Sequence, residues 1–132
     1  MKNFTENTRV QVPAALHLCK LGYTYLDDLT SYNPQTNILT DIFIRSVKRL
    51  NPALTDLECS QLLDKIVGIL NNDDLGKEFY TMLSSNSGVK LIDFADANNN
   101  EWHVTTEFTC ENVESGDSFR PDLSLIHIWR CR

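Results

Sequence analysis

The cysteines and histidines are the side chains with the most specific chemistry, and their spacing does not predict a metal centre. Protein zinc sites take cysteine or histidine ligands in closely spaced pairs. The sequence has no Cys-x-x-Cys pair, and its histidines share no ligand-like spacing with the cysteines, which are Cys19, Cys59, Cys110 and Cys131. Buried or incidental reduced thiols are the simpler interpretation.

Carboxylates are the next candidates, and each group has a structural and a chemical interpretation. Asp73 and Asp74 follow an apolar helical stripe, where acids break one helix and cap the positive end of the next. Cation binding is the alternative for these two residues. Glu101, His103 and Glu107 share a segment predicted to be a strand and could face one cleft. A solvent-exposed strand face explains these three residues more simply.

Composition and charge describe an ordinary globular chain of one domain. Its 132 residues are 42% hydrophobic and 23% charged, which is typical of neither disordered nor membrane proteins. No apolar run could cross a bilayer, and the start lacks the apolar stretch of a secretory signal, so we expect a cytoplasmic protein with no membrane partner. A net charge of −6 argues against tight DNA binding by this chain alone.

Helices are predicted for the first two-thirds of the chain. Pro13 fits a helix start and Gly22 a helix end, with an extended segment after it. Thr55 and Glu58 form a capping box, in which each side chain satisfies a backbone N–H of the other residue. The expected helices cover about residues 14–21, 38–50, 56–70 and 75–84, with a turn-rich loop at 30–36.

Strands are predicted after Gly88, where the apolar period changes from helical to alternating. Residues 89–94 and 102–110 are expected to form two strands joined by a turn at 96–100. The second strand alternates apolar and polar residues, which predicts one buried face. A polar loop at 111–118 leads to residues 119–122, where a third strand begins.

Phe119-Arg120-Pro121-Asp122 and a set of earlier segments form a specific combination in a fixed order. The earlier segments are residues 3–18, 21–23, 37–43, 49–52, 72–76, 86–94 and 100–108. Together they resemble the amino-terminal region of the restriction (R) subunits of type I restriction enzymes, over about residues 3–122. Residues 119–122 are similar to the Pro-Asp with which the active site of PD-(D/E)xK nucleases begins.

The resemblance implies a fold and a function. The fold would be α/β, an incomplete PD-(D/E)xK restriction-endonuclease-like domain with a helical front, an antiparallel β-hairpin and the start of a third strand. The full-length protein would cleave double-stranded DNA with Mg²⁺ and translocate DNA with ATP, in complex with modification and specificity subunits. In that nuclease class a strand-borne aspartate and a later Glu-x-Lys strand hold the metal ion.

Two residues match site positions of the resembled class. The resemblance implies that Asp122 is catalytic and a metal ligand, and that Glu6 is the auxiliary acid on the first helix. A turn aspartate after Pro121 and a helix-start glutamate are the structural alternatives. No Glu-x-Lys follows Asp122 and no ATP-binding loop occurs in the sequence. The chain alone is therefore expected to be inactive.

The last ten residues depart from the family pattern. Residues 123–132 resemble the translation of a transposase adapter from sequencing libraries, so we divide the chain into a native 1–122 and a non-native 123–132. Without Arg130 and Arg132, Lys plus Arg falls from 12 to 10 against 18 acids, a net charge of −8. The tail alternates by accident, and we expect it to pair with the strand at 101–110.

A second function class remains open. The chain could be a small non-enzymatic α+β module that binds another protein. A Glu-x-Lys and a helicase motor in the genomic continuation favour the nuclease, whereas a stop codon after Asp122 favours the module.

Overall fold

The computed structural model describes residues 5, 7–27, 32–33, 36–85, 88–111 and 115–127, without the side chains of Asn7, Thr8 and Glu111. The chain divides into two compact units. The sheet unit comprises Met1–Leu39 and Glu101–Arg132, and the helical unit comprises Thr40–Asn100. Within the described residues, no helix combines the length and the apolar character needed to cross a membrane.

The sheet unit begins with a π-helical turn, η1 (Asn7–Gln11), that runs into helix α1 (Val12–Lys20). Pro13 lies in the first turn of α1, directly after the π-helical turn. After the helix, Gly22 has a φ of +104°, a conformation that side chains disfavour, and it turns the chain into a short strand. The predicted helix and the extended segment after it are confirmed.

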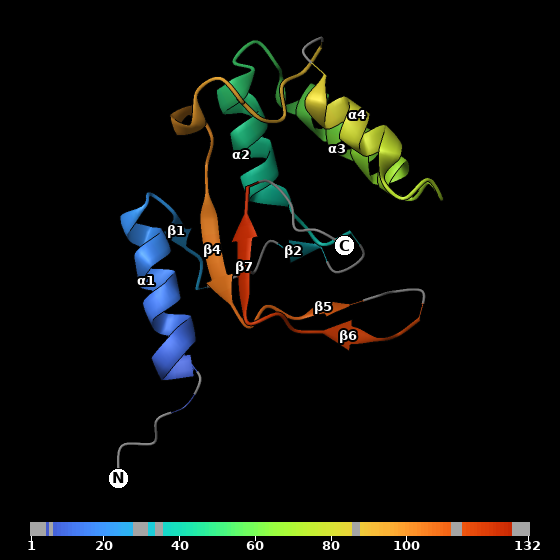
Figure 1. The fold of residues 1–132 in the computed structure, drawn as a ribbon. Coiled ribbons are helices and arrows are strands. Elements are labelled where there is room, and N and C mark those ends of the chain that lie inside the picture. The colour runs from blue at the N-terminus through green and yellow to red at the C-terminus, as the bar shows by residue number, and fades with distance from the viewer. Residues whose placement is uncertain are drawn as a thin grey trace. The chain divides into compact units, whose positions relative to one another are not determined.

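A mixed sheet lies beside α1 (Figure 1). Strand β4 (His103–Thr106) is central, with β1 (Thr24–Tyr25) parallel on one side and β7 (Leu123–Ile126) antiparallel on the other. The antiparallel β4–β7 pair is one part of a long hairpin. Its outer part, in the same register, is β5 (Cys110–Glu111) paired with β6 (Ser118–Phe119). A further small pair joins β2 (Tyr32–Asn33) to β3 (Ile38–Leu39). The α/β class is confirmed, and β7 is the strand expected opposite residues 101–110.

Strand β4 is buried on both faces, which corrects the prediction of a half-buried strand. His103, Val104 and Thr105 are consecutive and all buried, although consecutive side chains of a strand point to opposite faces. The strand is central in its sheet, and α1 packs against it. The alternation of polar and apolar residues in this segment therefore did not predict which side chains are exposed.

The helical unit contains α2 (Thr40–Leu50), α3 (Asp56–Leu70), α4 (Lys77–Ser84) and a 3-10 turn, η2 (Ala97–Asn99). The predicted helices are confirmed, except that α2 starts later because Ile38 and Leu39 form β3. The capping box is present: the Glu58 N–H donates to Thr55 Oγ1 at 3.3 Å, and the Thr55 N–H donates to Glu58 Oε2 at 2.8 Å. The Thr55 N–H and, after it, the Thr55 hydroxyl donate to the Glu58 carboxylate and so lower the pKa of Glu58.

Residues 89–94 do not form the predicted strand, because asparagine side chains take the place of a strand partner. Asn51 accepts the Lys90 N–H at 2.9 Å and donates to the Lys90 carbonyl at 2.8 Å. Asn100 accepts the Asp93 N–H at 2.8 Å and donates to the Asp93 carbonyl at 2.9 Å. A side-chain amide thus satisfies both backbone groups of one residue, as a neighbouring strand would.

We expect Asn100→Ala to destabilise the chain by about 1–3 kcal/mol, because the change leaves both backbone polar groups of Asp93 without these partners. Asn100 is only 6% exposed, so water replaces the lost bonds poorly. Urea unfolding measures the difference. Asn98→Ala is the matched control: its side chain is exposed, and it should change stability by less than about 0.5 kcal/mol. Equal effects of the two variants would contradict the prediction.

Candidate active site

Asp122 lies directly before β7, where the antiparallel pair of β4 and β7 begins. Its side chain is exposed. Its carbonyl oxygen accepts the Glu107 N–H at 3.2 Å, which holds its backbone against the end of β4. The carboxylate of Asp122 is therefore exposed to solvent, while its backbone is hydrogen-bonded within the sheet unit.

Asp122 lies between two strand pairs that share one register. In the β5–β6 pair, Cys110 lies opposite Phe119. Continuing that register by three residues puts Glu107 opposite Asp122, in agreement with their backbone hydrogen bond. One further step gives Thr106 opposite Leu123, the pairing found between β4 and β7. The position of Asp122 therefore agrees with the register on both sides of it, in the β5–β6 pair and in the β4–β7 pair.

Glu107 is the residue that the hairpin brings opposite Asp122. It is exposed, as expected for a solvated face, and its φ of +52° ends the regular path of β4. The sequence analysis did not pair these two carboxylates. Reading the polar loop at 111–118 as a hairpin turn would have shown the pairing, because residues 107 and 122 are equally far from its centre.

Two hydroxyl groups also lie at this end of the sheet. Tyr25 Oη and Thr106 Oγ1 are 3.0 Å apart and form a hydrogen bond between β1 and β4. Thr106 lies opposite Leu123, the residue after Asp122, and successive side chains of a strand point to opposite faces of the sheet. Sequence reasoning missed this pair because 81 residues separate its members, and only the parallel pairing of β1 with β4 brings them together.

His103 and Glu101 do not lie on a solvent-exposed strand face, so that interpretation is wrong for both. His103 Nε2 and Glu101 Oε2 are 3.3 Å apart, and their side chains are only 7% and 16% exposed. Burial lowers the pKa of the nearby His127 to about 4, with a smaller contribution from His103, while Glu101 acts in the opposite direction. The His127 ring packs edge-on against Trp102 at 4.7 Å between ring centroids. These residues form a packed end of the sheet unit.

The remaining candidates divide into structural residues and residues outside the described part of the chain. Glu6 lies outside the described residues. Cys59 and Cys110 are buried free thiols, in agreement with the structural interpretation. Asp74 accepts the N–H groups of Gly76 at 3.0 Å and of Glu78 at 2.8 Å, so it caps α4 as expected.

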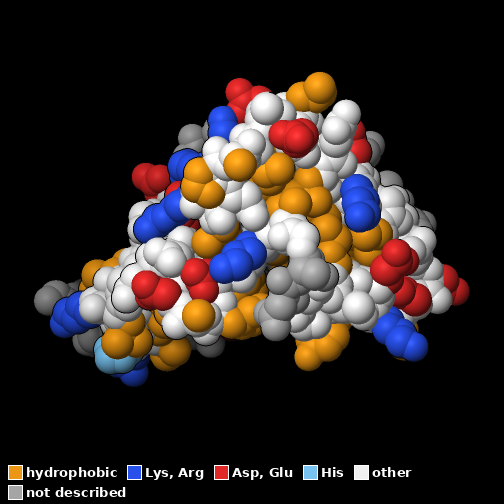
Figure 2. Space-filling view, turned by 90° about the horizontal axis from the view of Figure 1, so that it is seen from above, with side chains coloured by type: hydrophobic (Ala, Val, Ile, Leu, Met, Phe, Trp, Pro, Cys, Tyr) orange, Lys and Arg blue, Asp and Glu red, His pale blue; other side chains and the backbone are white. Residues whose placement is uncertain are grey.

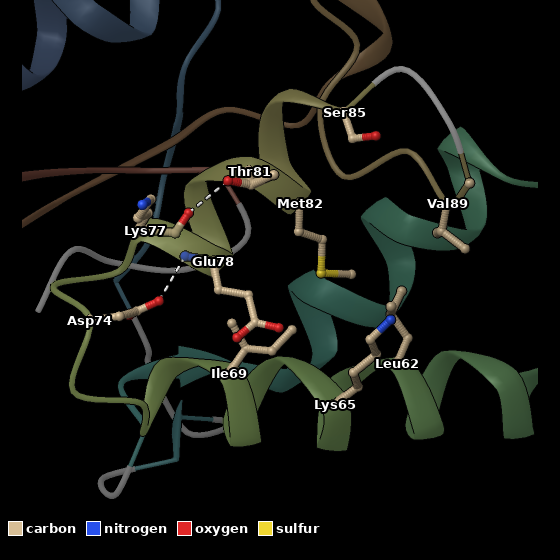
Figure 3. Close-up of a pocket in the computed structure, with 11 residues that line it drawn as sticks. Leu62, Lys65, Ile69, Asp74, Lys77, Glu78, Thr81, Met82, Ser85 and Val89 are labelled. Atoms are coloured by element: carbon tan, nitrogen blue, oxygen red, sulfur yellow. Dashed lines mark hydrogen bonds between the residues drawn. The ribbon is translucent and has the colours of Figure 1, made fainter.

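A groove of about 630 Å³ lies in the helical unit between α3 and α4 (Figure 3). Leu62 and Ile69 of α3 form one wall, and Met82 of α4 points towards them. Asp74 and Glu78 are its lining carboxylates, and both accept hydrogen bonds from neighbouring groups of the same unit. The groove has the character of an apolar packing surface, and Asp122 is not among its lining residues.

The donor chemistry around Asp122 suits a hard divalent cation but provides few ligands. Carboxylate oxygens are the ligands that Mg²⁺ prefers, usually with several waters retained. Among the described residues, no group of three or more His, Cys, Asp or Glu side chains could hold a metal ion together. Asp122, with Glu107 opposite, therefore fits one part of a magnesium site.

Charge on the surface gives little support to DNA binding by this segment alone. In the face shown in Figure 2, Lys and Arg side chains are interspersed with Asp and Glu and form no continuous basic surface. This distribution agrees with the net charge of −6.

Comparison with known proteins decides the family. Residues 3–127 match the family described as "Type I restriction enzyme R protein N terminus". The chain belongs to this family. The matched residues include parts of both units, and Asp122 is among them.

A curated relative agrees with the restriction-subunit assignment. It is the "Putative type I restriction enzyme MjaIXP endonuclease subunit" of Methanocaldococcus jannaschii, 35% identical over 142 residues. The alignment covers 89% of this chain but only 14% of the relative, so the chain spans a small part of that protein's length. No solved structure matches the chain significantly.

Proposed function

We propose that the chain is the amino-terminal part of a PD-(D/E)xK nuclease domain in the restriction subunit of a type I restriction enzyme, and that Asp122 is its catalytic metal ligand. The observation that carries the proposal is the placement of Asp122. In a chain of this family, the Pro121-Asp122 step puts an exposed carboxylate where β7 begins beside β4.

Asp122 would bind Mg²⁺ through hard carboxylate oxygens. A magnesium ion held there would polarise the phosphate and lower the pKa of the attacking water. The Glu107 N–H donates to the Asp122 carbonyl and so holds the backbone that carries the carboxylate. Glu6 remains the candidate auxiliary acid, and the second carboxylate and the lysine would come from a Glu-x-Lys strand after Asp122.

The wider activity belongs to the full-length restriction subunit, in which natural sequence follows Asp122. That subunit would act on double-stranded DNA in the cytoplasm, use ATP to translocate it, and work with modification and specificity subunits. The family description and the relative's name support this proposal. Asp122→Ala in the full-length subunit tests it, because a protein-binding module would retain its function without this carboxylate.

Residues 123–132 are proposed to be non-native, and the burial pattern of β7 supports this. Ser124 is 6% exposed, and its hydroxyl has no hydrogen-bond partner among the described residues. Its neighbour Leu125 is 53% exposed. The strand thus buries a polar side chain and exposes an apolar one, which costs stability on both faces.

We expect the continuous gene to differ from this sequence directly after the Asp122 codon. The physical reason is that a selected strand would place an apolar side chain at the position of Ser124. Sequencing genomic DNA across this point is the measurement, and a Glu-x-Lys should follow within a few tens of residues. Recovery of the same ten codons in the gene would show that the tail is native.

A further inference from the structure

We propose that the outward face of helix α1 binds an amphipathic helix with acidic edges from the rest of the restriction subunit. The inference goes beyond the proposed nuclease function, because it uses the family membership of the chain and no residue assigned to the active site. It starts from the composition of α1, whose hydrophobic residues extend beyond the side that the sheet covers.

Hydrophobic residues occupy more of the surface of α1 than the sheet unit buries. A helix of a globular protein normally carries one apolar stripe, and it buries that stripe. In the sheet unit α1 packs against β4 and β1 at the margin of the sheet (Figure 1), and Ala15 is its one buried residue. The other hydrophobic residues of the helix are Val12, Ala14, Leu16, Leu18 and Cys19.

The outward face of α1 is formed by a row of three residues. Val12, Leu16 and Lys20 follow one another at intervals of four, so they lie on one side of the helix. Val12 is 44% and Leu16 is 59% exposed, and Lys20 is exposed as well. Such a row is a ridge of the kind that packs into a groove on the surface of a second helix.

The charge around this outward face is positive. Residues 7–21 include Arg9, His17 and Lys20 and no acid, although the whole chain has 18 acidic and 12 basic residues. All three basic side chains are exposed. Opposite charges at the edges of a helix contact select the partner and its orientation, so a helix with an apolar stripe and acidic edges is complementary to α1. DNA fits less well, because Val12 and Leu16 offer phosphates no hydrogen-bond donor.

The rest of the restriction subunit is the source that the length of the relative favours. The chain covers only 14% of that protein, so most of a subunit of this length lies outside the chain. A segment of the same polypeptide has a high effective concentration at α1, so a contact of modest area is enough to hold it. A separate subunit would need a larger interface to stay bound.

The test is carbodiimide cross-linking of the full-length subunit alone, because this reagent joins a lysine to a carboxylate in direct contact. Mass spectrometry should find Lys20 joined to an Asp or Glu beyond residue 122, in a segment with an apolar helical stripe. Leu16→Gln should lower the yield of this product roughly tenfold, because it removes an apolar contact between the two helices. Leu57→Gln is the matched control: Leu57 is 68% exposed on α3, and its variant should leave the yield unchanged.

The wild-type cross-link needs no substitution, so the test does not depend on the folding of a variant. Absence of the Lys20 product, or an equal yield from Leu16→Gln and the wild type, would overturn the inference. A Lys20 product that forms only with a modification or specificity subunit would also overturn it, because a partner subunit would then cover the face. Slower acetylation of Lys20 in the presence of DNA, without the cross-link, would assign the face to DNA instead.

Asp122→Ala keeps this inference separate from the proposed function. The Asp122→Ala subunit should give the same Lys20 cross-link, whether or not it cleaves DNA. Full cleavage by Asp122→Ala would reject the nuclease site and leave the α1 contact standing, whereas loss of the cross-link in a cleaving wild-type subunit would reject the contact alone.

Discussion

Asp122→Ala in the full-length restriction subunit is expected to lower the rate of DNA cleavage by about a hundredfold to a thousandfold or more. The carboxylate is exposed at the end of the hairpin, and its removal would take away the proposed metal ligand without disturbing a buried contact. ATP hydrolysis should continue, because the motor would lie elsewhere in the subunit. A plasmid cleavage assay with Mg²⁺, beside an ATPase assay, measures both.

Asp117→Ala is the matched control for Asp122→Ala. Asp117 is an exposed aspartate in the turn of the same hairpin, so its variant removes an equal charge five residues away and should cleave normally. Asp122→Asn should lose most of the activity as well, because a neutral amide binds Mg²⁺ weakly. Full cleavage by Asp122→Ala in a folded complex would remove Asp122 from the active site.

The purified 132-residue chain is expected to show no metal-dependent DNA cleavage. Asp122 and Glu107 give a hard divalent ion too few fixed oxygens, even with water as the other ligand. No lysine of a Glu-x-Lys strand is present to stabilise the charge that develops on the phosphate. The net charge of −6 also repels the substrate.

Supercoiled plasmid provides the measurement, since a single nick converts it to a form that separates on a gel. The chain is incubated with plasmid and Mg²⁺, with EDTA as the metal-free control. The Asp122→Ala form of the same chain shows whether any nicking comes from a contaminant. Nicking that needs Mg²⁺ and disappears in this variant would contradict the prediction and show that the fragment contains a sufficient site.

Local signals predicted the helices of this chain well. Proline at a helix start, a capping box and glycine after a helix act within one turn of backbone, so sequence alone reveals them. Thr55 and Glu58 are the clearest case, because the predicted reciprocal hydrogen bonds are present. Residues 89–94 show the limit: their alternating pattern is that of a strand, yet Asn51 and Asn100 satisfy the backbone instead.

The candidate site was only partly predictable. The Pro121-Asp122 step is visible in the sequence, and its interpretation depended on family resemblance. Glu107 and the Tyr25–Thr106 pair were not identified, because each depends on strand register. Tyr25 and Thr106 are 81 positions apart, and their contact needs β1 to lie parallel to β4.

The sequence by itself determined the family, the helices with their caps, and Asp122 as the candidate catalytic residue, because these depend on neighbouring residues or on residue order. Only the tertiary structure decided that Glu107 lies opposite Asp122, that both faces of β4 are buried, and that residues 89–94 have no strand partner. The physical reason is that strand pairing and burial depend on residues far apart in the sequence. Backbone hydrogen bonds are the same for nearly all residue types, so the packing of the whole unit determines which strands pair.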